Sequence, residues 1–227
     1  MINQTNDVKA NRSVVDYEEW YHTERHNTHH HEEYYDARGK IALQKFFLDC
    51  DLKARILDFG CGVGQNILYL PNAMGYDISK YSTEFAKKKG INATSDLAVV
   101  PNESFDIVFS AHVLEHHPHP KTMLEDIHQK LMPGGKLILV LPHERHGKAE
   151  GKLDLNQHLY AWNFQNINNL LITTGFAIKS NRYLRGAGYN RLLPLLKLGG
   201  LGLYRTATNL VSRLAGIKEL MTIAVKV

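Results

Sequence analysis

Short apolar runs alternate with helix-like segments along most of this chain. The runs end at glycines, acidic residues or polar turns, which is typical of buried strands. Between them, apolar residues recur at three- and four-residue intervals, as in helices that cover a sheet. The predicted strands are residues 55–59, 73–77, 91–94, 105–110, 136–141, 176–183 and 221–227, and the predicted helices are residues 41–49, 79–89, 120–131 and 164–173.

Strands that alternate with helices in this way indicate βαβ units. We therefore expect a doubly wound α/β fold, with a mostly parallel sheet that is covered on both faces. In such sheets, ligands bind at the carboxyl ends of the strands. The segments expected to carry the function are residues 58–64, Asp77, residues 110–119 and residues 142–146.

The first of these segments has the sequence Asp58-Phe-Gly60-Cys-Gly62-Val-Gly64. Dinucleotide loops space their glycines as G-x-G-x-x-G and place a pyrophosphate on helix amides. Asp58 would repel a pyrophosphate by on the order of a few kcal/mol in a partly buried site. It would attract a ligand that carries an ammonium and a sulfonium. The loop therefore favours a cationic ligand, with a tight turn that binds nothing as the alternative.

Two further acids follow predicted strands. Asp77 comes 19 residues after Asp58, where an acid can accept both hydroxyls of a ribose. Asp96 follows the third strand and could accept a hydrogen bond from a purine amine. The alternatives are a helix N-terminal charge before Ser79 for Asp77 and an ordinary loop acid for Asp96.

Five segments in order, ILDFGCGVGQN, MGYDIS, TSDLAVVP, FDIVFSAHVLEHHPHP and LMPGGKLILVLP, resemble the motifs of class I S-adenosylmethionine-dependent methyltransferases. The resemblance covers roughly residues 41–180 and is greatest to the small-molecule type that has V-L-E-H after the fourth strand. It implies a Rossmann-like methyltransferase fold with seven strands, in which residues 176–183 and 221–227 form an antiparallel hairpin at one edge.

The same resemblance implies S-adenosylmethionine as the cofactor. Asp58, Gly60 and Gly62 would hold its methionine end, with Cys61 packed behind it. The ribose and adenine would lie against the acids after the second and third strands, and the methyl acceptor would lie near the fourth. The implied cofactor-binding residues are Asp58, Gly60, Cys61, Gly62, Asp77, Ile78, Asp96, Leu97, Ser110 and His112.

Methyl transfer from a sulfonium is an in-line displacement that depends on alignment and on exclusion of water. A hydroxyl acceptor also benefits from a base that titrates near pH 7, as histidine does. We expect His116 or His143 to be that base, although either side chain could instead have a packing role. The other candidates are His112, Glu115, His117, His119, His146, His158 and Tyr160.

Histidine is abundant and clustered, so a metal site must be considered. Glu115 and the histidines that follow it offer metal ligands, but their spacing matches no regular zinc pattern and no cysteine pair accompanies them. His22 and His26 have the spacing of a helical metal pair, yet two ligands make a weak site. We therefore expect no metal, and we interpret the histidine-rich residues 1–39 as a polar surface arm or lid.

Residues 40–227 would form the methyltransferase domain, including a basic helical insert at residues 184–220. An apolar stripe in the insert is formed by Leu203, Ala207, Leu210, Val211 and Leu214, after a hinge at Gly199-Gly200. The insert is expected to be a helical cap on the core, a lid over an anionic substrate, or an amphipathic patch for peripheral contact with acidic lipids.

Charge is uneven along the chain. Lys and Arg number 27 against 23 Asp and Glu, and seven cations accompany one anion between Arg182 and Glu219. The basic character belongs to this one segment, so we expect no nucleic-acid partner. With only Cys50 and Cys61, no signal-peptide stretch and no apolar run long enough for a membrane span, we expect a cytoplasmic protein.

Together these features predict an S-adenosylmethionine-dependent methyltransferase that acts on a small molecule, with an oxygen of a sugar or related metabolite as the acceptor. The alternatives are C- or N-methylation of a lipid-like or quinone-like acceptor, a nicotinamide-dependent oxidoreductase, and a cofactor-binding protein without catalytic activity.

Overall fold

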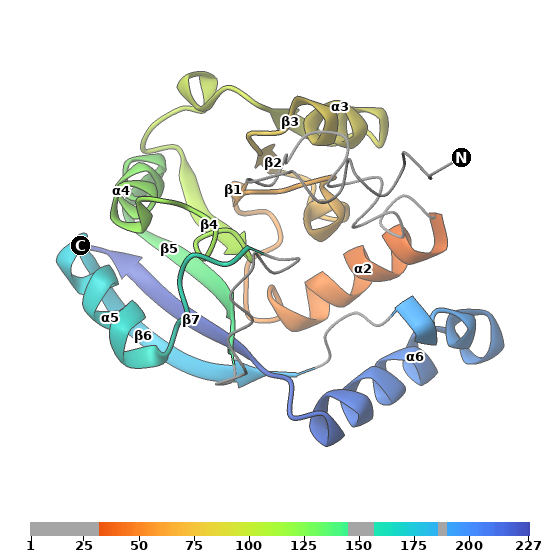
Figure 1. Ribbon diagram of the computed structural model, residues 1–227. Helices are drawn as coiled ribbons and strands as arrows, with labels where there is room; N and C mark the ends of the chain where they lie inside the picture. Colours follow the sequence, from red (N-terminus) through yellow and green to blue (C-terminus); the bar gives the residue numbers. More distant parts are fainter. Residues whose placement is uncertain (1–31, 145–156, 186–189) are drawn as a thin grey trace, which may run out of the picture.

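A computed structural model describes residues 32–144, 157–185 and 190–227 of the chain. They form a seven-stranded sheet in the order β3-β2-β1-β4-β5-β7-β6 (Figure 1). The strands are β1 (Ile56–Phe59), β2 (Ala73–Tyr76), β3 (Asn92–Thr94), β4 (Phe105–Ala111), β5 (Leu131–Pro142), β6 (Phe176–Leu184) and β7 (Glu219–Lys226).

Helices cover both faces of the sheet. The α-helices are α2 (Glu32–Lys45), α3 (Lys80–Lys88), α4 (Pro120–Lys130), α5 (Phe164–Thr173) and α6 (Pro194–Leu214), and the short 3₁₀ helices are η3 (Gln65–Ile67), η4 (Leu97–Val99) and η5 (Asn190–Leu192). Alternate strand residues face opposite sides: Leu57 and Val108 join the core under α4 and α5, whereas Ile56 and Ile107 join the core under α2 and α3. The predicted doubly wound fold is therefore confirmed.

The last strand is the one that reverses direction. β7 lies antiparallel between β5 and β6, as the expected edge hairpin requires. Because it runs the other way, its first residue, Glu219, lies beside Pro142 at the end of β5 and Leu184 at the end of β6. Glu219 thus reaches the same edge as the loops that follow the parallel strands.

The glycine loop leads into the short 3₁₀ helix η3. Elsewhere, local structure differs from the sequence expectation at two places. The Pro133-Gly-Gly135 turn lies inside β5, opposite a register shift in β4, and Gly134 adopts a φ of 74°. α2 begins at Glu32 and passes through residues 39 and 40, where the arm was expected to end.

The insert is helical, but α6 turns its leucines outward. Tyr204, Thr208 and Ser212 are buried, whereas Leu210 and Leu214 are 56% and 81% exposed. Gly199 and Gly200 have non-helical backbone angles and divide α6 at the predicted hinge. None of the helices in residues 32–144, 157–185 and 190–227 is long and apolar enough to cross a membrane.

Candidate active site

The glycine loop is held in a conformation that favours glycine. Gly60, Gly62 and Gly64 have φ values of 85°, 53° and 83°, in the left-handed region that side chains rarely adopt. A Cβ atom at Gly60 would also collide with the side chain of Val113. Glycine at these positions therefore lets the chain turn tightly at the end of β1, where the amides of Gly60 and Cys61 donate to the carbonyl of Tyr76.

Asp77, directly after β2, forms hydrogen bonds that connect the glycine loop to the start of α3. Its Oδ2 accepts a hydrogen bond from the amide of Gly62 at 2.7 Å, and its Oδ1 accepts one from the amide of Ser79 at 2.9 Å. Ser79 in turn caps α3, since its side chain accepts a hydrogen bond from the amide of Ser82. The Asp77 carboxylate keeps further lone pairs for a ligand hydroxyl.

Asp58 lies behind the loop, at the end of β1. It is only 1% exposed, and neither carboxylate oxygen has a hydrogen-bond partner among the described residues. Burial, reinforced by the nearby charge of Asp77, raises the pKa of Asp58 well above its ordinary value. A buried carboxylate without a partner is costly, and a bound cation would complement it.

A cavity of about 440 Å³ opens in front of the loop, within the size range of small-molecule sites. We call it the donor cavity. The predicted site residues that line it are Gly60, Cys61, Gly62, Asp77, Ile78, Leu97, His112 and His116. The predicted site residues that do not line it are Asp58, Asp96, Ser110 and His143.

Ser110, Asp96 and His143 have contacts outside the donor cavity. The Ser110 hydroxyl donates to the carbonyl of Phe59 at 2.8 Å, and Asp96 caps η4 by accepting from the amide of Ala98 at 2.9 Å. The ring of His143 packs against Tyr183 with centroids 5.4 Å apart. His143 does not line the donor cavity, so it stays a predicted base without support from the cavity geometry.

His112 is the central charged group of the cavity. Its φ of 58° is unusual for a residue other than glycine and is often found at functional sites. Its Nε2 lies 3.1 Å from Glu219 Oε1, and its Nδ1 lies 3.4 Å from Glu115 Oε1. Burial would lower the pKa of His112, but these two carboxylates outweigh it and raise the pKa to about 9. His112 is thus an imidazolium at neutral pH.

Glu219 joins this group to α2. Its carboxylate also bonds the ammonium of Lys45, so it connects two cations. Burial would raise the pKa of Glu219, but His112 and Lys45 together hold that pKa well below its usual range. No motif in the sequence pointed to Glu219, Lys45 or Arg38 as site residues, although Glu219 and Arg38 line the cavity. The expected antiparallel direction of the last strand could have indicated Glu219, because such a strand begins at the edge where the parallel strands end.

His116 contributes a second imidazole to the cavity wall. Its Nε2 lies 3.9 Å from Glu115 Oε1, and its ring meets that of His158 edge to face with centroids 4.7 Å apart. Burial lowers the pKa of His116, although the charge of Glu115 opposes the shift. A neutral imidazole that faces the cavity can accept a proton.

The remaining histidines and Tyr160 lie farther from the loop. His117 lines the cavity, and its Nδ1 accepts from the amide of His119 at 3.1 Å. The Tyr160 hydroxyl donates to the carbonyl of Pro118 at 3.0 Å, and His158 bonds Glu144. His22, His26 and His146 lie outside the described residues.

Glu115, His116 and His158 could share a cation, since one ligand atom from each lies within 4.8 Å of the others. This grouping differs from the one considered in the sequence, because His158 comes from a later segment. Glu115 already faces the imidazolium of His112, which reduces its excess negative charge. The sequence expectation of no metal stays a prediction.

The donor cavity fits S-adenosylmethionine. Gly60 and Gly62 line it without side chains, Asp77 offers acceptors for ribose hydroxyls, and the unpartnered carboxylate of Asp58 matches a positively charged ligand.

Comparisons with known proteins agree with a cavity for S-adenosylmethionine. A family described as a methyltransferase domain matches residues 14–185. The phosphoethanolamine N-methyltransferase of Triticum aestivum is 27% identical over 120 residues, which are 45% of this chain and 24% of that protein. The 27-O-demethylrifamycin SV methyltransferase of Amycolatopsis mediterranei is 31% identical over 101 residues, 37% of each chain. The chain thus spans less than half the length of these curated relatives.

A solved structure also shares the fold. It is Haemonchus contortus phosphoethanolamine N-methyltransferase 2 in complex with phosphomonomethylethanolamine and S-adenosylhomocysteine, with a TM-score of 0.61 and 17% identity over 94% of this chain and 60% of that one. The sheet and the glycine loop define a Rossmann-like, S-adenosylmethionine-binding class of protein. The chain belongs to the methyltransferase-domain family, whose cofactor is S-adenosylmethionine.

Proposed function

We propose that this protein is a methyltransferase that transfers the methyl group of S-adenosylmethionine to an oxygen of a small polar metabolite such as a sugar. The donor cavity carries this proposal, because the glycine loop, Asp77 and the histidines after β4 surround a single space. Family membership favours this activity over a nicotinamide-dependent oxidoreductase.

The cofactor-holding residues follow from their places around the cavity. Gly60, Cys61 and Gly62 would lie along the methionine part, Asp77 with Ile78 at the ribose, and Leu97 at the adenine. Asp58 would act from behind the loop through its charge, and Asp96 only through the cap that positions Leu97. When bound, the cofactor supplies an electrophilic methyl group on a positively charged sulfur.

His116 is the proposed base. Its lowered pKa keeps the imidazole neutral near pH 7, and Glu115 beside it stabilises the imidazolium that forms on proton uptake. His112 is a poorer base because its raised pKa leaves it already protonated. Its charge and position suit it to orienting the acceptor.

Two measurements test this function. Calorimetry should detect binding of S-adenosylhomocysteine and no binding of NAD. Transfer of a labelled methyl group should then be followed against a panel of sugars, phenols and amines. Binding of NAD without S-adenosylhomocysteine would end the methyltransferase proposal, and donor binding without transfer to any acceptor would leave a cofactor-binding protein.

The base is tested by substitution. His116→Ala should lower kcat by about 10²- to 10⁴-fold, as expected for loss of a general base, while donor affinity stays within about twofold. His119→Ala is the matched control, because His119 is exposed and outside the cavity lining. Equal turnover in the two variants would remove His116 from the role.

Nitrogen is the second candidate acceptor atom. The relative from Triticum aestivum is named an N-methyltransferase. The same acceptor panel decides between the two atoms.

A further inference from the structure

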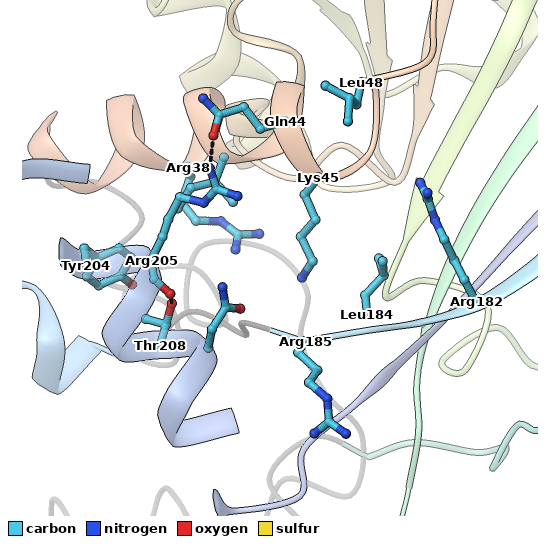
Figure 2. A pocket seen from close by; sticks show the side chains of 12 residues that line it. Arg38, Gln44, Lys45, Leu48, Arg182, Leu184, Arg185, Tyr204, Arg205 and Thr208 are labelled. Carbon is cyan, nitrogen blue, oxygen red and sulfur yellow. Dashed lines mark hydrogen bonds between the residues drawn. The ribbon is translucent and has the colours of Figure 1, made fainter. Parts of the chain in front are cut away.

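A second cavity of about 230 Å³ lies between α2, the end of β6 and α6, and Figure 2 shows the side chains around it. We call it the cation cavity, because basic side chains line it and no described carboxylate does. The basic residues are Arg38 and Lys45 of α2, Arg182 of β6, Arg185 just after β6, and Arg205 of α6.

These cations have different depths. Arg38, Lys45 and Arg205 are partly buried, whereas Arg182 and Arg185 are exposed at the rim. In Figure 2, the Lys45 side chain extends into the space between α2 and α6, and Arg205 donates to Gln44 across that space. The inner three would therefore touch a ligand, and the two at the rim would attract it.

The cavity has more positive charge than its surroundings neutralise. Lys45 pairs with Glu219, but no ion pair joins Arg38, Arg182 or Arg185 to a carboxylate of the described residues. The Nε of Arg38 is buried without a hydrogen-bond partner there. Like charges gathered in a partly buried space repel one another, so an anion would stabilise this arrangement.

We propose that the cation cavity binds a phosphate group carried by the methyl acceptor. Arginine forks match the oxygens of phosphate in pairs, and a phosphate monoester carries nearly two negative charges near pH 7. A carboxylate, with one charge and two oxygens, would leave more of this positive charge unmatched. The inference rests on the proposed function, because it assigns the acceptor of that reaction.

The two cavities adjoin, which ties the phosphate to the reaction. Arg38 lines both of them. Lys45 of the cation cavity bonds Glu219 of the donor cavity, which in turn contacts His112. An acceptor anchored by its phosphate among the arginines would extend past Arg38 toward His116, with its methylated atom away from the phosphate.

Phosphate of this kind has two sources, a free phosphorylated metabolite and the headgroup of a lipid. The exposed leucines of α6 favour the second source. Leu203 and Leu210, which are 44% and 56% exposed, are close in sequence to the lining residues Arg205 and Thr208, and Leu214 at the end of the helix is 81% exposed. A lipid surface could cover these side chains while a headgroup enters the cavity.

Binding is tested with inorganic phosphate, by calorimetry on the full chain saturated with S-adenosylhomocysteine. Arg205→Gln and Arg38→Lys should each weaken phosphate binding about tenfold or more, the second because lysine keeps the charge but loses the fork. Arg213→Gln removes the same charge from the exposed, distant part of α6 and should leave binding unchanged. Absence of phosphate binding, or equal weakening in all three variants, would overturn the inference.

The acceptor arm uses matched pairs of sugars and amino alcohols, each with and without a phosphate group, in the methyl transfer assay. KM should be about 100-fold lower for the phosphorylated member, and Arg205→Gln should remove most of that difference. A parallel arm uses vesicles with and without phosphatidic acid, and selective binding to the acidic vesicles would identify the lipid source.

The outcomes separate this inference from the proposed function. Equal KM values for the phosphorylated and unphosphorylated members of each pair, with no change in Arg205→Gln, would overturn the inference while the methyltransferase stands. Phosphate binding that depends on Arg205, combined with donor binding but no transfer to any acceptor, would support the cation cavity as a phosphate site and refute the methyl transfer.

Discussion

The donor cavity takes most of its walls from the loops after β1, β2 and β4, whereas the cation cavity is assembled from α2, β6 and α6. The first holds Asp77, Asp126 and Glu219 on its wall, with Asp58 behind them. The second holds five cations and no described carboxylate. One space suits a positively charged cofactor and the other an anionic group, and Arg38 lies at their junction.

The two sites depend on the sheet in different ways. The core sets the register of the strands, and the strands fix the loops of the donor cavity, so a residue is placed at this cavity simply by coming directly after a strand. The cation cavity depends instead on how two helices pack near the sheet edge. The donor site should therefore respond sharply to backbone changes, and the cation cavity mainly to changes of charge.

The largest effect is expected from Gly60→Ala. The new Cβ would have to occupy a φ of 85° and would meet Val113, so affinity for S-adenosylhomocysteine should fall on the order of 100-fold. Calorimetry measures it, with phosphate binding in the cation cavity as an internal check that the fold survives. Adding Val113→Ala should recover part of the loss, and unchanged affinity in the single variant would contradict the proposed geometry.

A smaller effect is expected from Asp58→Asn, which should raise the stability of the protein without ligand but lower its affinity for the methyl donor. Burial raises the pKa of Asp58, so the stability this group contributes is fully present below about pH 3.8 and is lost as pH rises through its folded pKa. The variant should therefore gain stability over the wild type as pH rises from 5 to 9, reaching about 1–2 kcal/mol without ligand. Donor affinity should fall about tenfold at high pH, because the charge opposite the cation is gone.

Urea unfolding at several pH values and calorimetry at pH 8 check both halves of this prediction. A variant that is less stable than the wild type at every pH would mean that the Asp58 carboxylate has a stabilising partner. An unchanged donor affinity would mean that its charge does not act on the cofactor.

The smallest effect is expected on the outer face of α6. Leu214→Ala should change the free energy of unfolding by less than about 0.5 kcal/mol, since the side chain is 81% exposed. Tyr204→Ala, on the buried face beside the cation cavity, should cost about 3 kcal/mol. Urea unfolding measures both, and a cost above 1 kcal/mol for Leu214 would show that this face is covered in solution.

The donor side of the molecule could be predicted largely from the sequence, for a physical reason. The strand and the glycine turn follow each other directly and Asp77 ends the next strand, so Gly60, Cys61, Gly62 and Asp77, which line one cavity, could be assigned to one site before the fold was known. Burial of Asp58 and the capping role of Asp96 could not, because both depend on how the loop lies over its neighbours.

The acceptor side could not be predicted in the same way. Periodicity identified the apolar stripe of α6 but not the side that faces the protein, since the helix buries Tyr204, Thr208 and Ser212 instead. The charge count located an excess of cations from Arg182 onward, but Arg38 comes from the predicted polar arm and Lys45 from the predicted helix at residues 41–49. Glu219 was missed because the predicted last strand began at residue 221, whereas β7 begins at Glu219.

The antiparallel β7 has a consequence for how such a protein can change. β6 ends and β7 begins at the same edge of the sheet. The segment that connects these two strands therefore starts and ends close to the donor cavity. Its length and composition can vary without a shift in the register of the central strands. Substitutions and insertions in this connecting segment alone could therefore change the preferred methyl acceptor, while the loops proposed to bind the methyl donor stay unchanged.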